Sequence, residues 1–123
     1  MKLFIILGSI NAFLSVALGA FGAHGLKDKL SNEMMAVYHT GVQYHMYHAL
    51  GLFVIGLLAG KIGDEGQIRA AGWFMQIGII LFSGSLYALS TSGVRSLGIV
   101  TPFGGVAFLV GWFLLGVAAW KGL

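Results

Sequence analysis

The chain has few of the residues that cover the surface of a soluble protein. Its 123 residues include no cysteine, a single proline and four acidic residues, and only 9% are charged. A soluble domain has about 25% charged residues, so this composition cannot cover a water-soluble globule. The absence of cysteine excludes disulfides, thiolate metal sites and cysteine nucleophiles. What the chain has instead is hydrophobic residues, at 58% of the total, and 20 glycines.

The charged residues leave four long uncharged windows between them. These windows cover residues 3–26, 34–60, 70–94 and 96–120. Each is longer than the roughly 20 apolar helical residues that cross the hydrocarbon core of a bilayer. The sequence therefore predicts an all-α integral membrane protein, built as a single four-helix transmembrane bundle. The predicted spans are about 3–23, 36–59, 70–89 and 98–120.

The spans also lack the carboxylates that several activities require. No Asp or Glu lies within a predicted span. A histidine base there has no carboxylate to orient it, and a proton-coupled transporter would lack its usual intramembrane acid. The net charge is +3, but the seven basic residues are scattered rather than gathered in a patch. Scattered basic residues are typical of lipid headgroup contact, so we expect no nucleic-acid partner. Because the spans lack carboxylates, we also expect no enzyme activity.

The basic residues favour one membrane orientation by a small margin. Four spans place both termini on the same side of the bilayer, together with the hydrophilic connection 61–69. The two sides hold four and three basic residues, namely Lys2, Lys61, Arg69 and Lys121 against Lys27, Lys29 and Arg95. Because Lys and Arg are enriched on the cytoplasmic side, the sequence predicts cytoplasmic termini, by an excess of one charge.

Small residues recur along the spans at spacings that favour close helix packing. In span one they stand near every fourth position, and span two ends in a pair of glycines four residues apart. Such stripes let another helix approach closely. The helix-packing positions that we predict are Gly19, Gly22, Gly56 and Gly60. We also expect Asn11 and Ser15, which share a face of span one, to hydrogen-bond across the bundle.

Span two holds the main concentration of chemically active side chains. They are Tyr38, His39, Gln43, Tyr44, His45, Tyr47 and His48. At 100° per residue, His45 and His48 lie roughly opposite His39 and Gln43. His45 and His48 could share one metal ion with His24, at the end of span one, as a third ligand. Alternatively, His24 and His48 could be axial ligands of a haem between two helices or two protomers.

A structural role for these histidines is the interpretation that we favour. Two histidines without carboxylate or thiolate support are a thin set of ligands for zinc. Histidines and tyrosines in a span can instead hydrogen-bond between helices or lie at the membrane interface. We therefore predict no cofactor, and we keep His24, Gln43, His45 and His48 as the candidate polar functional cluster.

Span three carries its polar residues on one face. These are Gln76, Ser83, Tyr87 and Ser90, separated by seven, four and three residues. Such spacings repeat on one side of a helix. Because a glutamine in contact with hydrocarbon is costly, we expect this face to line the bundle interior or, in an oligomer, a pore.

Span four begins in an irregular segment. The candidate motif for its start is Thr101, Pro102, Gly104 and Gly105. Proline is favoured at the first helical position, where its missing N–H costs nothing. Two alternatives therefore stay open: a helix with Thr101 as its N-cap and Pro102 as its first residue, or a kinked helix that begins near Gly98.

Several short segments together carry a resemblance to a known family. They are residues 19–26 (GAFGAHGL), 43–50 (QYHMYHAL), 84–87 (GSLY), 101–105 (TPFGG) and 111–112 (GW). In this ordered set the chain resembles the domain of unknown function 423 family of small bacterial membrane proteins, which has small eukaryotic transmembrane relatives. The resemblance implies a four-span protein of the cell membrane and brings no reaction, substrate or cofactor. It singles out His24, Gln43 and His48 as polar positions of the family pattern.

Three functions are compatible with these features. We expect a membrane component without enzymatic activity whose helices assemble into a homo-oligomer or bind another membrane protein. The first alternative is an oligomeric transporter or channel for an ion or small solute. The second is a redox component with a histidine-ligated metal or haem.

Overall fold

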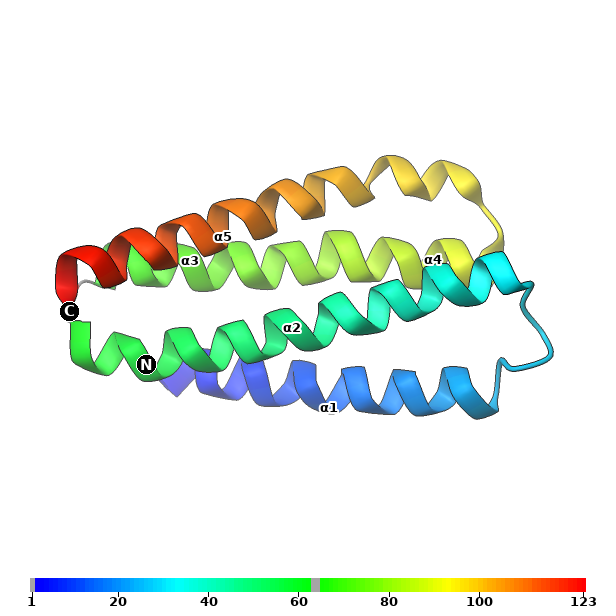
Figure 1. The fold of residues 1–123 in the computed structure, drawn as a ribbon, viewed down its shortest axis with the longest axis horizontal. Helices are drawn as coiled ribbons and strands as arrows, with labels where there is room; N and C mark the ends of the chain where they lie inside the picture. The colour runs from blue at the N-terminus through cyan, green and yellow to red at the C-terminus, as the bar shows by residue number, and fades with distance from the viewer. Residues whose placement is uncertain (1, 63–64) are drawn as a thin grey trace.

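The computed structural model describes residues 2–62 and 65–123, which form four long helical rods packed side by side (Figure 1). Rods one and two are single helices, whereas rods three and four each combine several helical segments. The elements are α1 (Lys2–His24), α2 (Asn32–Ile62), α3 (Glu65–Gly78), η1 (Ile79–Ser83), α4 (Gly84–Ser92), η2 (Arg95–Ile99) and α5 (Thr101–Gly122). In Figure 1 the two termini lie at the same end of the bundle.

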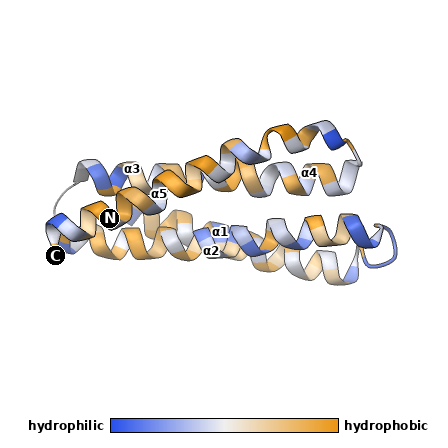
Figure 2. Cartoon of the chain, turned by 45° about the horizontal axis from the view of Figure 1, so that its top comes forward, coloured by the Kyte–Doolittle hydropathy of each residue, from blue (hydrophilic) through white to orange (hydrophobic). Residues whose placement is uncertain are grey.

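Among residues 2–62 and 65–123, four helical segments are long and apolar enough to cross a membrane. They are Lys2–His24, Asn32–Ile62, Gly66–Ser92 and Arg95–Gly122. Figure 2 shows hydrophobic residues along the rods and hydrophilic segments gathered mostly toward the two ends of the bundle. The predicted all-α bundle with four membrane-spanning segments is therefore confirmed.

The rods are longer than the predicted spans, most clearly at the end that holds the termini. α2 continues through Ile62 and α3 begins at Glu65, so most of the predicted connection 61–69 is helical. Gly63 and Asp64, in the middle of that connection, lie outside the described residues. Hydropathy alone could not predict this, because polar residues at a membrane surface can continue a helix beyond the apolar core.

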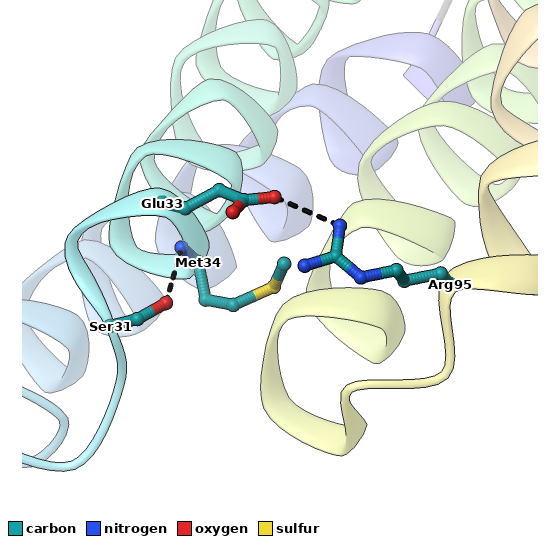
Figure 3. A network of polar contacts seen from close by, with 4 residues as sticks. All are labelled: Ser31, Glu33, Met34 and Arg95. Carbon is teal, nitrogen blue, oxygen red and sulfur yellow. Dashed lines mark hydrogen bonds and ion pairs between the residues drawn. The ribbon is translucent and has the colours of Figure 1, made fainter.

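At the opposite end, side chains fix where the helices begin. The hydroxyl of Ser31 accepts a hydrogen bond from the backbone N–H of Met34 at 3.2 Å, so Ser31 caps α2. Arg95, at the start of η2, forms an ion pair of 2.9 Å with Glu33 in the first turn of α2 (Figure 3). Both groups precede the apolar core of their spans.

Rod three contains a π-helical turn, η1, which the sequence periodicity did not predict. The backbone N–H of Gly84 donates to the carbonyl of Ile79, five residues earlier, instead of the usual four. The hydroxyl of Ser83 donates to the carbonyl of Gly41 in α2 at 2.7 Å. π-helical turns are rare and frequently occur at functional sites.

Rod four differs from both predicted alternatives. A 3₁₀ turn over Arg95–Ile99 leads into α5, whose N-cap position is Val100. Thr101 is therefore the first helical residue rather than the cap. Its hydroxyl donates to Ser85 at 2.6 Å, because the hydroxyl proton of Ser85 is already bonded to the carbonyl of Phe82.

The small residues predicted to pack helices do so inside the chain. A methyl group at Gly22 would collide with the ring of Tyr38, and one at Gly56 would meet Ile5 at 2.8 Å. Gly19 faces Val42. At the fourth predicted position, Gly60, the space beside the backbone is open as far as the described residues extend. Three of the four positions therefore hold α1 against α2 within one chain.

Candidate functional site

A chain of four hydrogen-bonded side chains crosses the middle of the bundle. Asn11 of α1 and His45 of α2 are 5% and 4% exposed. The Asn11 Nδ2 group donates to the Oε1 atom of Gln76 in α3 at 2.8 Å. The two ring nitrogens of His45 contact the Asn11 Oδ1 atom at 3.0 Å and the Tyr87 hydroxyl of α4 at 2.9 Å. We call Asn11, His45, Gln76 and Tyr87 the His45 chain.

The partners of Asn11 determine where the protons of this chain lie. Its Nδ2 group also donates to the carbonyl of Leu7 at 2.8 Å, and a carbonyl only accepts, so the amide orientation is set. The Asn11 Oδ1 atom is then an acceptor, which places a proton on Nε2 of His45. In the neutral ring Nδ1 is unprotonated and accepts from the hydroxyl of Tyr87. Every contact in the chain thus has one donor and one acceptor.

Other buried polar groups also bond across helices. The hydroxyl of Ser15 donates to the carbonyl of Val42 at 3.0 Å. Together with the bond from Asn11 to Gln76, this contact confirms the prediction that Asn11 and Ser15 hydrogen-bond across the bundle. Ser90 is also buried, but its hydroxyl donates within its own helix, to the carbonyl of Tyr87. The polar face of rod three therefore contacts α1 and α2 through separate bonds.

A cleft of about 350 Å³ lies beside the His45 chain. Its lining residues are Asn11, Leu14, Leu18, His45, Gln76, Ile79, Ile80, Gly84 and Tyr87. We call it the Gln76 cleft. The side-chain N–H groups of Gln76 have no hydrogen-bond partner among the described residues. Leu14 and Ile80 are exposed, so this cleft opens sideways, toward the lipid that would surround the bundle.

A second cleft, of about 410 Å³, lies between α2, η1 and α5. Its lining residues are Tyr44, Tyr47, His48, Phe82, Gly105, Phe108, Leu109 and Trp112. We call it the His48 cleft. His48 lies near the middle of α2, is 4% exposed, and stacks on Phe108 with ring centroids 3.4 Å apart. Tyr47 and Leu109 are exposed at its margin, so this cleft also opens sideways.

The predicted polar cluster is divided by the structure. His45 and His48 are buried, whereas His24 and Gln43 are exposed. His24 ends α1, close to the end of the bundle where α2 begins, and His48 stands 16 residues into α2. At 1.5 Å per residue this is about 24 Å along the helix, so one chain does not bring His24 and His48 to a common ion or haem iron. Both nitrogens of His45 are already bonded.

The described residues contain no group of three His, Cys, Asp or Glu side chains that could hold a metal ion. Whether the protein carries a cofactor stays a prediction. Sequence reasoning missed the aromatic partners of His48, Phe108 and Trp112, because nothing in the pattern of α5 pairs it with α2. The residues at 111–112 did belong to the segments that carry the family resemblance.

Comparison with known proteins places the chain in a family. Residues 18–105 match the model of a family described as "Protein of unknown function (DUF423)". The chain is 60% identical over 121 residues to the UPF0382 membrane protein YwdK of Bacillus subtilis, with 98% of each chain covered. It is 51% identical, with the same coverage, to a UPF0382 membrane protein of Staphylococcus epidermidis. No solved structure matches.

These matches extend over nearly the whole chain and agree with its four apolar rods. The names of these relatives describe them as membrane proteins and state no activity. The chain is therefore a polytopic helical membrane protein that belongs to the DUF423 (UPF0382) family.

Proposed function

We propose that the protein is a membrane component without enzymatic activity that binds a second, bilayer-embedded molecule at its side. This proposal rests on the position of polar atoms that have no hydrogen-bond partner among the described residues of the bundle. The free N–H groups of Gln76 and the ring of His48 each line a cleft that opens sideways. Unpaired polar groups in a membrane span are costly and mark functional sites, so a molecule from the lipid phase is the natural partner.

The interior of the bundle supports lateral binding over transport along its axis. Ten buried apolar residues pack into one core. They are Phe4, Leu52, Ile55, Ile68, Ala71, Met75, Ile79, Phe108, Leu115 and Ala118. In the His45 chain, which lies beside this core, each contact pairs one donor with one acceptor. A transporter or channel, the alternative function, would need a path between several copies of the chain.

The partner can also be a second copy of the chain or another membrane protein. Close approach of a further helix needs small residues with open space beside them. A methyl group added at Gly60 in α2 would meet no neighbouring atom of the described residues within 4 Å. Gly60, rather than Gly19 or Gly22, is where we expect such a helix to pack.

We place the protein in the plasma membrane with both termini in the cytoplasm. The end of the bundle that holds the termini carries one more basic residue than the other end. The positive-inside rule supports this orientation.

Lipid extraction of the purified protein tests lateral binding. Gly105 lines the His48 cleft, and a methyl group there would meet only a ring carbon of Phe82, at 4.0 Å. Gly105→Leu therefore fills the cleft without a collision at the backbone, and Gly116→Leu is the matched control on the same helix. Mass spectrometry of solvent extracts should find a molecule enriched with the wild type and with Gly116→Leu, but lost from Gly105→Leu. Identical extracts from all three proteins would contradict the proposal.

A further inference from the structure

The ring of His48 presents an unused hydrogen-bond acceptor. Its Nδ1 atom lies 2.6 Å from the carbonyl oxygen of Tyr44. Because a carbonyl only accepts, the proton of the neutral ring is on Nδ1 and the lone pair is on Nε2. No partner of Nε2 is found among residues 2–62 and 65–123. The lining of the cleft therefore includes one acceptor, Nε2 of His48, that no donor of the described residues reaches.

Neighbouring rings hold this acceptor in place. His48 stacks on Phe108 with an angle of 7° between the ring planes. Trp112 meets His48 edge-on, with ring centroids 5.7 Å apart and an angle of 60°. Rotation of the imidazole would break the bond to Tyr44 and the stack on Phe108. The direction of the Nε2 lone pair is thus set before any ligand arrives.

The walls of the His48 cleft favour a flat ring. Tyr44, Phe82 and Trp112 line it together with the stacked pair His48 and Phe108. Aromatic side chains stack well on other planar rings. The volume of about 410 Å³ lies in the range of roughly 300–1,000 Å³ that is usual for small-molecule sites.

These features select among the molecules of a bilayer. An acyl chain would fill the space but leave Nε2 without a donor. A metal ion requires several ligand atoms, and within the described part of the chain His48 is the one imidazole or carboxylate side chain that lines this cleft. A planar ring that bears a hydroxyl group can stack against the aromatic walls and donate a hydrogen bond to Nε2 of His48.

We propose that the His48 cleft binds a membrane-dissolved phenol or quinol, whose hydroxyl group donates a hydrogen bond to Nε2 of His48. This inference deepens the proposed function, because it names the class of molecule that the lateral cleft takes. The ring of the ligand lies among Tyr44, Phe82 and Trp112, and any apolar tail extends through the open side of the cleft into the lipid.

Two probes that differ only in the donor test this inference. The protein in phospholipid nanodiscs is titrated calorimetrically with 1-naphthol and with 1-methoxynaphthalene, after subtraction of the signal from empty nanodiscs. The wild type should bind 1-naphthol at least tenfold more tightly, because the methoxy compound has no O–H group. In His48→Phe, which keeps a ring against Phe108, the two affinities should become equal.

Filling the cleft provides an independent variant. Gly105→Leu should weaken the binding of both probes at least tenfold, and Gly116→Leu should leave both affinities unchanged. Circular dichroism and size-exclusion elution identical to those of the wild type establish that each variant is folded. If His48→Phe does not fold, the comparison of the two probes on the wild type and on Gly105→Leu still decides the matter.

Each contrary result has a distinct meaning. Equal affinities of the wild type for the two probes, or a preference for 1-naphthol that survives in His48→Phe, would overturn the role of His48 as acceptor. An unchanged affinity in Gly105→Leu would overturn the location of the site. The absence of binding of either probe to the wild type would overturn the phenol or quinol class. The proposed function is judged separately, by the extracted molecule, and it survives if that molecule lacks a ring or a hydroxyl group.

Discussion

Removal of Asn11 is expected to destabilise the bundle, because this residue connects three elements through the His45 chain. Asn11→Leu keeps a side chain of similar size but removes the bonds to Gln76, His45 and the Leu7 carbonyl. Two of these bonds join different helices. Side-chain hydrogen bonds in membrane proteins average about 0.6 kcal/mol and reach about 1.7 kcal/mol. We therefore expect the free energy of unfolding to fall by about 1–3 kcal/mol.

A double-mutant cycle separates the hydrogen bond from general damage to packing. His45→Phe removes the other partner and keeps a ring in its place. The double variant lacks both Asn11 and His45, so neither side chain remains with its partner missing. Its loss in free energy of unfolding should therefore be about 1 kcal/mol smaller than the sum of the two single losses. Reversible unfolding in mixed micelles, followed by helicity, measures all four proteins. Costs that add to within about 0.5 kcal/mol would refute the coupling between the two side chains.

Two further predictions concern packing and orientation. Gly22→Leu should lower the free energy of unfolding by about 1–3 kcal/mol, because its side chain must displace the ring of Tyr38. Gly60→Leu, with open space beside it, should change that free energy by less than about 0.5 kcal/mol, and equal losses in the two variants would contradict the assigned contacts. Because the chain has no cysteine, Lys27→Cys and Lys121→Cys each introduce a single label site. A membrane-impermeant maleimide applied to intact cells should label Lys27→Cys alone, and the reverse pattern would place the termini outside.

The fold was predictable because the positions of the charged residues along the sequence leave few possible arrangements of the chain. Four uncharged windows separated by short polar segments leave few arrangements besides four antiparallel helices. The helix ends at Gly25 and Ser31 were also readable, since both depend on local hydrogen bonds. The length of α2 and the 3₁₀ turn before α5 could not be predicted from the sequence, because they depend on packing between the rods.

The candidate site was predictable only in part. Helical periodicity correctly separates His45 and His48 from His39 and Gln43, because burial follows the face of the helix. It does not reveal that His45 and His48 serve different clefts. Their partners come from other rods, and the π-helical turn η1 changes the register of rod three in a way that a constant period of 3.6 residues cannot describe.

Photo-cross-linking in native membranes is the most direct test of lateral binding. A benzoylphenylalanine at Leu109, which is 71% exposed at the margin of the His48 cleft, is compared with one at Phe103, which is 66% exposed on the same helix outside the cleft. After irradiation, intact-protein mass spectrometry should find one dominant adduct at position 109 and a spread of ordinary phospholipid adducts at position 103. The same spread of phospholipid adducts at both positions would contradict a specific lateral ligand.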